Sequence, residues 1–110
     1  MGRKPNRKVI EIVRSFKSKE SKKYGIEKII LFGSQARGTQ TRGSDIDLIV
    51  VVKKEIKDRP GFMTSLIREW HRVHKINKPV DFIPYSVKEF NRLARGTTLV
   101  SQALSEGIVV

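Results

Sequence analysis

The sequence contains no cysteine, which excludes a disulfide-rich secreted scaffold and a zinc site built on thiolates. The longest aliphatic run, Leu48 to Val52, is far too short to span a bilayer, and no apolar signal-peptide segment follows the basic N-terminus. Aromatic residues make up only 7% of the chain and offer no evident stacking platform for single-stranded nucleic acid. We therefore expect a soluble, cytoplasmic protein without a membrane partner.

The length of 110 residues and the 38% hydrophobic content are those of one globular unit. A chain of this size can bury roughly two-thirds of its unfolded surface, which suffices for one core without a disulfide or a structural metal. The sequence therefore predicts a single domain over residues 1–110.

Acidic charge is also scarce, because 23 Lys and Arg residues stand against 11 Asp and Glu, a net charge of +12. Residues 1–44 hold 12 basic and 3 acidic side chains, a net +9, whereas residues 45–110 hold 11 and 8, a net +3. Such a field attracts nucleic acid, nucleotide phosphates or an acidic protein. A solvated, lysine-rich helix is the alternative explanation of the basic N-terminal part.

Apolar residues recur along the chain at the spacing of helices with one buried face. The spacing predicts helices over residues 6–23 and 62–75, the second after a charged loop that ends at Pro60-Gly61. Ser86 and Glu89 fit a capping box, so a helix is expected to begin at Ser86. A last helix from about residue 99 is expected to end at Gly107 in a left-handed cap.

Short runs rich in β-branched residues predict strands over residues 26–32, 45–52 and 80–83, with Pro84 ending the third. Residues 108–110 are expected to form a terminal strand. Its position at a sheet edge leaves dimerisation open. The glycine-, serine- and threonine-rich segment 33–44 permits one short helical turn in an otherwise irregular loop.

Two acidic residues open the second of these strands. Asp45 and Asp47 are two positions apart, so their side chains are expected on the same face, roughly 6–7 Å apart along the strand. Carboxylates at the polar end of an apolar strand repel each other unless a cation lies between them. A hard divalent ion such as Mg²⁺ is the simplest such cation.

A third acid, Asp81, is expected beside them. Two strands joined by a crossover helix pair in parallel in nearly all cases, which places Asp81 near Asp47 if the register permits. Three acids on two adjacent strands suit a site with one or two metal ions. Taken singly, an Asp-x-Asp is more often a solvated strand end, and Asp81 alone could pair with Lys78.

Gly33 and Ser34 supply the complementary phosphate-binding part. A glycine where a buried strand turns into a helical turn allows close approach of a ligand, and the N–H groups and hydroxyl of that turn can donate to phosphate. Arg37, one turn later, is expected on the same side and can form two parallel hydrogen bonds to phosphate. A lone Gly-Ser would more often be an ordinary turn.

Residues 33–38, GSQARG, followed by residues 44–48, SDIDL, closely resemble the signature of the minimal nucleotidyltransferases of the DNA polymerase β-like superfamily. The resemblance covers nearly the whole chain. It implies an α+β, mixed α/β fold, namely the nucleotidyltransferase palm, with a central mixed β-sheet flanked by helices.

The resemblance also implies roles for single residues. Gly33, Ser34, Arg37 and Ser44 would bind the nucleotide, and the three acids Asp45, Asp47 and Asp81 would be catalytic and would bind Mg²⁺, with two ions expected. The implied reaction is attack of an acceptor hydroxyl on the α-phosphorus of ATP, with loss of pyrophosphate.

Stand-alone members of this family are typically paired with a small HEPN-domain toxin. The resemblance therefore implies an antitoxin that attaches AMP to a tyrosine of such a partner. One alternative is a non-catalytic, nucleotide-binding antitoxin that covers the toxin. Another is an RNA nucleotidyltransferase or RNA-binding module, which the net charge of +12 suggests. Base preference, oligomeric state and the role of the basic N-terminal helix stay open.

Overall fold

A computed structural model describes residues 6–38, 45–96 and 98–110. Its elements follow one another as α1 (Arg7–Tyr24), β1 (Ile26–Phe32), α2 (Ser34–Arg37), β2 (Ile46–Val52), α3 (Arg59–Arg68), the π-helix η1 (Glu69–Val73), β3 (Val80–Ser86), α4 (Val87–Leu93), α5 (Leu99–Glu106) and β4 (Ile108–Val109). The strands form one sheet in the order β3-β2-β1-β4. β2 and β3 run parallel, whereas β1 is antiparallel to both β2 and β4, which confirms the expected mixed sheet.

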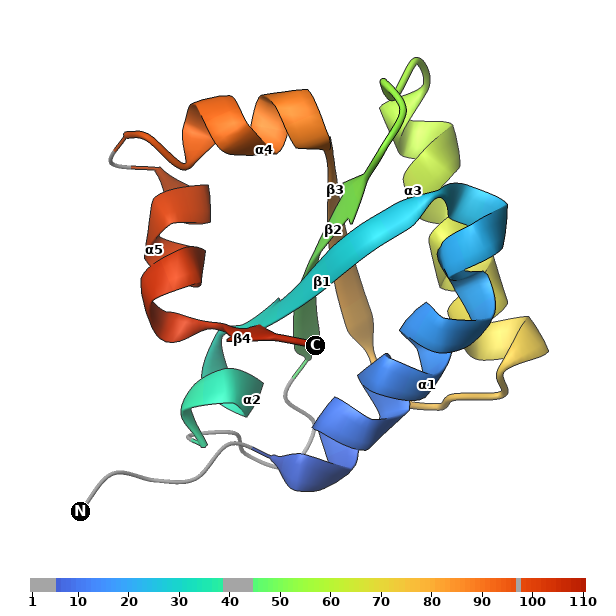
Figure 1. Ribbon diagram of the computed structural model, residues 1–110. Helices are drawn as coiled ribbons and strands as arrows, with labels where there is room; N and C mark the ends of the chain where they lie inside the picture. Colours follow the sequence, from blue (N-terminus) through green and yellow to red (C-terminus); the bar gives the residue numbers. More distant parts are fainter. Residues whose placement is uncertain (1–5, 39–44, 97) are drawn as a thin grey trace.

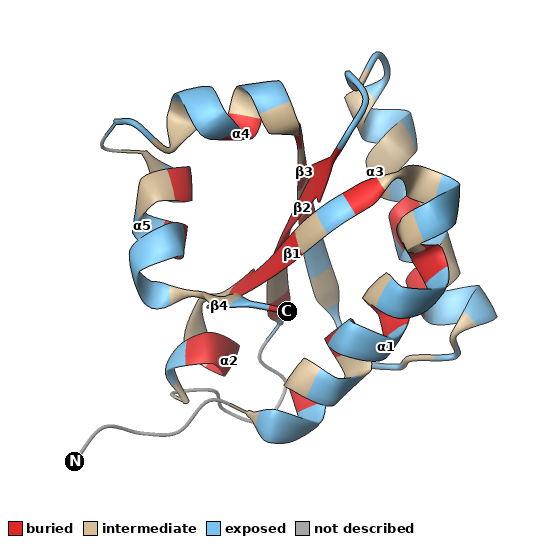
Figure 2. Cartoon of the chain, viewed as in Figure 1, coloured by how far each residue is buried: buried red, intermediate tan, exposed pale blue. Residues whose placement is uncertain are grey.

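Helices cover both faces of this sheet (Figure 1). On one face, α1, α3 and η1 enclose an aromatic core that includes Phe16, Trp70 and Phe82. On the other face, α4 and α5 enclose a smaller core around Ile49 and Phe90. In Figure 2 the buried residues lie along the strands and on the helix sides that face them.

Local signals explain where the first helix and the fourth begin and end. The Asn6 side chain accepts a hydrogen bond from the Val9 N–H, and α1 ends at Gly25, which has φ 66°. The capping box expected at Ser86 is present, since Ser86 and Glu89 each accept the other's backbone N–H. The expected boundaries of α1, β1 and α4 are thus confirmed.

Two expectations about proline are wrong. Pro60 does not belong to the loop but to the first turn of α3, where a missing N–H costs nothing, and Asp58 caps the helix by accepting the Gly61 N–H at 3.1 Å. Pro84 does not end β3, which continues to Ser86. β3 is an edge strand, so one side of its backbone needs no partner strand.

The expected left-handed cap at Gly107 is also wrong, because Gly107 is extended, with φ −86°. A glycine is needed at this position because the neighbouring atoms leave no room for a Cβ. A Cβ at this position would lie 2.4 Å from the Ala103 carbonyl oxygen and 2.8 Å from Ile30. The chain therefore passes tightly from α5 into β4, which pairs with β1 at the sheet edge opposite β3.

Some apolar residues that the helical spacing predicts to be buried are exposed in the structure. Leu66 and Trp70 are fully buried, but Val73 is 61% exposed because η1 changes the helical period before it. Leu99 and Leu104 of α5 are also exposed. No helix in the described part of the chain is both long and apolar enough to cross a membrane.

Candidate active site

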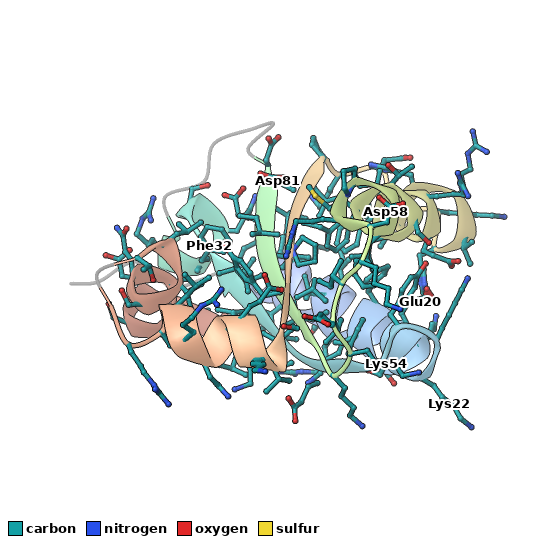
Figure 3. All side chains as sticks on the ribbon, turned by 90° about the horizontal axis from the view of Figure 1, so that it is seen from above. Glu20, Lys22, Phe32, Lys54, Asp58 and Asp81 are labelled. Carbon is teal, nitrogen blue, oxygen red and sulfur yellow. The ribbon has the colours of Figure 1, made fainter. Side chains whose placement is uncertain are left out.

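Two of the predicted acids are direct neighbours in the sheet. The parallel register of β2 and β3 pairs Asp47 with Asp81, and neighbouring strands lie about 4.8 Å apart. Asp45 immediately precedes β2 and is exposed, as is Asp81. Asp81 lies at the exposed end of the sheet in Figure 3. The crossover through α3 and η1 thus brings together acids that are far apart in sequence.

The electrostatics of this site show that its negative charge is not fully compensated. Burial raises the pKa of Asp47 above its ordinary value, and the charges of Asp81 and Asp45 raise it further. The charge of Arg37 acts in the opposite direction but does not cancel the other effects. A cation at these carboxylates would therefore be favourable, and three oxygen donors are the ligands that Mg²⁺ prefers.

Gly33 lies against this acidic group. It adopts φ 75° and ψ −156°, a conformation that is essentially restricted to glycine. A Cβ at Gly33 would lie 2.4 Å from Oδ2 of Asp47. Gly33 follows Phe32, which pairs with Asp47 across β1 and β2. The glycine is therefore needed both for the turn and for the close approach of that turn to the carboxylate.

The short helix α2 carries the expected phosphate-binding residues. The Gly33 carbonyl accepts the N–H groups of Ala36 and Arg37 at 3.2 Å, which holds the turn that begins at the half-buried Ser34. The exposed Arg37 lies 3.7 Å from Glu106 of α5 and still acts on the charge of Asp47. Ser44 lies outside the described residues.

Two hydrogen bonds that support the turn at Gly33 could not have been predicted from a local sequence pattern. Gln35 is buried, and its side-chain oxygen accepts a hydrogen bond from the Asn6 amide at 3.1 Å. The Asn6 N–H also donates to the Gln35 carbonyl at 3.1 Å. These bonds attach the start of α1 to α2 and thereby support the turn at Gly33. Gln35 is part of the GSQARG segment but was given no role by the sequence pattern, and Asn6 lies outside that segment.

A hollow adjoins the site between the end of β1 and helix α5. Phe32, Gly33 and Arg37 line one side, and Leu99, Gln102 and Ala103 line the other. Helix α5 lies more than 60 residues after the motif in the sequence, so its contribution follows only from the pairing of β4 with β1. The hollow offers space for a ligand that contacts the turn at Gly33.

The family model of the nucleotidyltransferase domain matches residues 8–110. The chain belongs to this family. The match includes all elements of the described fold except the first residue of α1, and with the acidic residues of β2 and β3 it identifies the chain as a nucleotidyltransferase, as the sequence motif indicated.

Curated relatives agree with this assignment. MJ1215 of Methanocaldococcus jannaschii, named as a predicted protein adenylyltransferase, is 34% identical over 73 residues, which cover 66% of this chain and 80% of that protein. MJ1305 of the same organism carries the same name and is 37% identical over 93 residues, covering 77% of this chain and 63% of that protein. This nucleotidyltransferase thus spans less than two thirds of MJ1305.

Solved structures share the fold. A chain in the crystal structure of a toxin-antitoxin with AMP-PNP has a TM-score of 0.58 at 22% identity, with 86% of this chain and 69% of that chain covered. A protein from Sulfolobus solfataricus named as a predicted nucleotidyltransferase has a TM-score of 0.52 at 23% identity, with 91% of this chain and 77% of that chain covered. Both similarities confirm the expected architecture of a mixed sheet between helices.

Proposed function

We propose that this nucleotidyltransferase transfers AMP from ATP to a hydroxyl group of a partner protein, a tyrosine of a HEPN-type toxin, and so acts as an antitoxin. The observation that carries the proposal is the pairing of Asp47 with Asp81, with Asp45 beside them and Gly33 against Asp47. Carboxylates and a phosphate-binding turn at one sheet end are the two parts that nucleotidyl transfer requires.

The acids Asp45, Asp47 and Asp81 would hold Mg²⁺, with two ions expected. Their fit to a hard cation is supported by the raised pKa of Asp47, since mutual repulsion of the carboxylates accounts for part of it. When bound, the divalent ion would neutralise the triphosphate and lower the pKa of the acceptor hydroxyl. Asp81, exposed beside Asp47, is proposed to accept the proton that this hydroxyl loses.

The nucleotide would lie against the turn between β1 and α2. The N–H groups and hydroxyl at Gly33 and Ser34 would donate to the phosphates, and Arg37 would form charge-assisted hydrogen bonds with them. Ser44 is proposed to contribute from the segment before β2. The acceptor oxygen would then attack the α-phosphorus, the bond to the bridging oxygen would break, and pyrophosphate would leave. Positioning and charge neutralisation are the chain's main contributions to the rate.

A protein acceptor is supported by the relatives. MJ1215 and MJ1305 are named as predicted protein adenylyltransferases, and the structurally similar chain with AMP-PNP comes from a toxin-antitoxin complex. The described part of this chain is fully used by the sheet and its covering helices, so it contains no separate acceptor-binding module. We therefore expect the partner protein to present its own hydroxyl to the aspartates.

The decisive experiment is transfer of label from α-phosphate-labelled ATP in the presence of Mg²⁺. The acceptor is the purified product of the neighbouring gene, with a lysate of the native host as a second source. The expected result is labelling of a small protein by the wild type and none by Asp45→Asn/Asp47→Asn. The matched control, Glu11→Gln/Glu27→Gln, removes two exposed carboxylates away from the site and should label normally.

Other outcomes have clear meanings. Label on RNA would overturn the protein-acceptor proposal and support an RNA nucleotidyltransferase. Neutralisation of the toxin by Asp45→Asn/Asp47→Asn, with no label from the wild type, would support a non-catalytic antitoxin that covers its partner. Replacement of the labelled tyrosine by phenylalanine should abolish labelling, and label retained on that variant would exclude the proposed acceptor.

A further inference from the structure

A second group of titratable side chains lies where the C-terminal half of α1 meets η1. It consists of Glu20 from α1, Glu69 from the start of η1 and His74 directly after η1. One ligand atom from each residue lies within 4.8 Å of the other two. Glu20 and Asp81 lie in different parts of the molecule in Figure 3. We call Glu20, Glu69 and His74 the Glu-Glu-His cluster.

The π-helix is what brings Glu69 and His74 together. The His74 N–H donates to the Glu69 carbonyl at 2.9 Å, a bond that spans five residues instead of four. In an α-helix, residues five positions apart point about 140° away from each other. The wider π-turn reduces this angle, and both side chains reach Glu20.

The cluster is buried and incompletely paired. The Glu20 and His74 side chains are each 8% exposed, and that of Glu69 is 12% exposed. Among the described residues, Nε2 of His74 and Oε2 of Glu20 have no hydrogen-bond partner although both atoms are buried. The Phe16 ring packs against the imidazole, with ring centroids 5.0 Å apart. Buried polar atoms without partners are rare and call for a ligand.

The charges at the cluster leave one carboxylate without a cation of its own. Lys23 forms an ion pair with Glu69. Glu20 lies beside Glu69 in the cluster, and its buried Oε2 has no partner among the described residues. A positive group between the two carboxylates is therefore favoured, and the imidazole Nε2 lies 3.7 Å from Oε1 of Glu20 as a third donor.

We propose that the Glu-Glu-His cluster binds a divalent transition-metal ion of the Zn²⁺ type. One imidazole and two carboxylates are ligands that Zn²⁺ accepts, and water would take the fourth position. Zinc bonds of about 2.0–2.2 Å place tetrahedral ligand atoms about 3.4 Å apart. The separation of 3.7 Å between Glu20 and His74 is already close to this value, and the flexible Glu69 side chain closes the remainder.

Such an ion would link α1 to the helical segment formed by α3 and η1. These elements cover the same face of the sheet but are separated in sequence by β1, α2 and β2. A surface groove is lined by Phe16, Lys19 and, of the cluster, His74. The proposed ion would stabilise this helical layer and is independent of the nucleotidyl-transfer site.

The test uses the metal-free full chain with Zn²⁺ and, separately, Co²⁺ as the probe. We expect binding of one ion per chain, a visible absorption spectrum of bound Co²⁺ typical of nitrogen and oxygen ligands, and an increase in Tm of about 12 °C at roughly hundredfold excess of Zn²⁺ over its Kd. No binding to the wild type would overturn the proposal outright.

The chain offers a matched pair of variants, because it contains two histidines and no cysteine. His74→Gln should lose the Co²⁺ spectrum and weaken Zn²⁺ binding at least tenfold. His71→Gln removes an exposed imidazole three residues earlier and should bind normally. Equal binding by both variants would contradict the assignment. Circular dichroism before metal addition verifies that each variant is folded.

Two further variants make the test independent of His74. Glu20→Gln is nearly isosteric and should also weaken Zn²⁺ binding, whereas Lys23→Met should strengthen it severalfold, since it removes the ammonium that competes for Glu69. Asp45→Asn/Asp47→Asn should leave the Co²⁺ spectrum unchanged. Loss of the spectrum in that last variant would place the ion at the aspartates and refute the proposal.

Discussion

The two carboxylate clusters of this protein are built in opposite ways. Asp45, Asp47 and Asp81 lie at an open sheet end, where two of the three are exposed and a ligand can reach them. Glu20 and Glu69 lie between packed helices, with side-chain exposures of 8% and 12%. The first cluster is arranged by strand register and the second by a π-turn. Because a substrate can reach the first cluster, that cluster is suited to catalysis. The second cluster is enclosed and is therefore suited to stabilising the fold.

The enclosed cluster depends on the aromatic core beneath it, and Phe16→Ala is the strongest way to break it. The Phe16 ring contacts Trp70, His74 and Phe82, and its removal leaves a cavity. We expect a loss of about 3–5 kcal/mol in the free energy of unfolding, measured by urea denaturation. Phe16→Leu should lose clearly less. A small and equal loss in both variants would mean that the site collapses without a cavity.

The open cluster, which consists of Asp45, Asp47 and Asp81, depends on Gly33. Gly33→Ala is therefore the corresponding change at this cluster. A Cβ would meet Oδ2 of Asp47 at 2.4 Å, and the backbone conformation is strained for alanine. We expect roughly 100-fold slower transfer of label, because the turn and the carboxylate must separate, and a stability loss of about 1–3 kcal/mol. Gly96→Ala, where a Cβ meets only Thr98 at 3.6 Å, is the control and should transfer normally.

The pH dependence of stability should reveal that the open cluster costs stability. Burial, then Asp81 and Asp45, raises the pKa of Asp47, so the folded protein holds a proton that the unfolded chain releases. Without divalent ions, the free energy of unfolding should fall as pH rises from the ordinary aspartate pKa through the raised pKa of Asp47. Asp47→Asn should remove this fall and increase Tm by a few degrees at neutral pH.

The control for that measurement is Glu27→Gln, which removes an exposed carboxylate of β1. Its pH profile should follow the wild type in thermal melts recorded with a chelator. A flat wild-type profile, or a fall of equal size in Asp47→Asn, would show that another group is responsible.

The smallest effect on stability is expected for a variant outside both clusters. Ser86→Ala removes the side chain that accepts the Glu89 N–H at the start of α4. We expect a loss of about 1 kcal/mol in the free energy of unfolding and normal transfer of label. Ser86→Thr keeps the cap and should lose less. A change in transfer rate with unchanged stability would contradict the purely structural role assigned to Ser86.

Local sequence patterns accounted for much of the fold. The apolar period and the cap predicted α1, the buried run predicted β1, and Ser86 with Glu89 predicted the start of α4, because each depends on residues within a few positions. The strand-helix-strand order also predicted the parallel pairing that places Asp81 beside Asp47, since crossover connections have one hand.

Other features depend on residues that are distant in sequence. Pro84 continues β3 because β3 lies at the sheet edge, and Gly107 is a glycine because α5 passes close to Ile30. The period of the third helix changes at Glu69, and no residue type in η1 announces a π-turn.

The sequence by itself therefore determined the open cluster, because its turn, its paired aspartates and the strand that returns Asp81 follow from short-range pattern and connection handedness. The Glu-Glu-His cluster, in contrast, depends entirely on the tertiary structure. Glu20 and Glu69 are 49 positions apart, and they meet because α1 packs beside the helical segment that contains η1. The π-type hydrogen bond from the His74 N–H to the Glu69 carbonyl also turns His74 toward the two carboxylates.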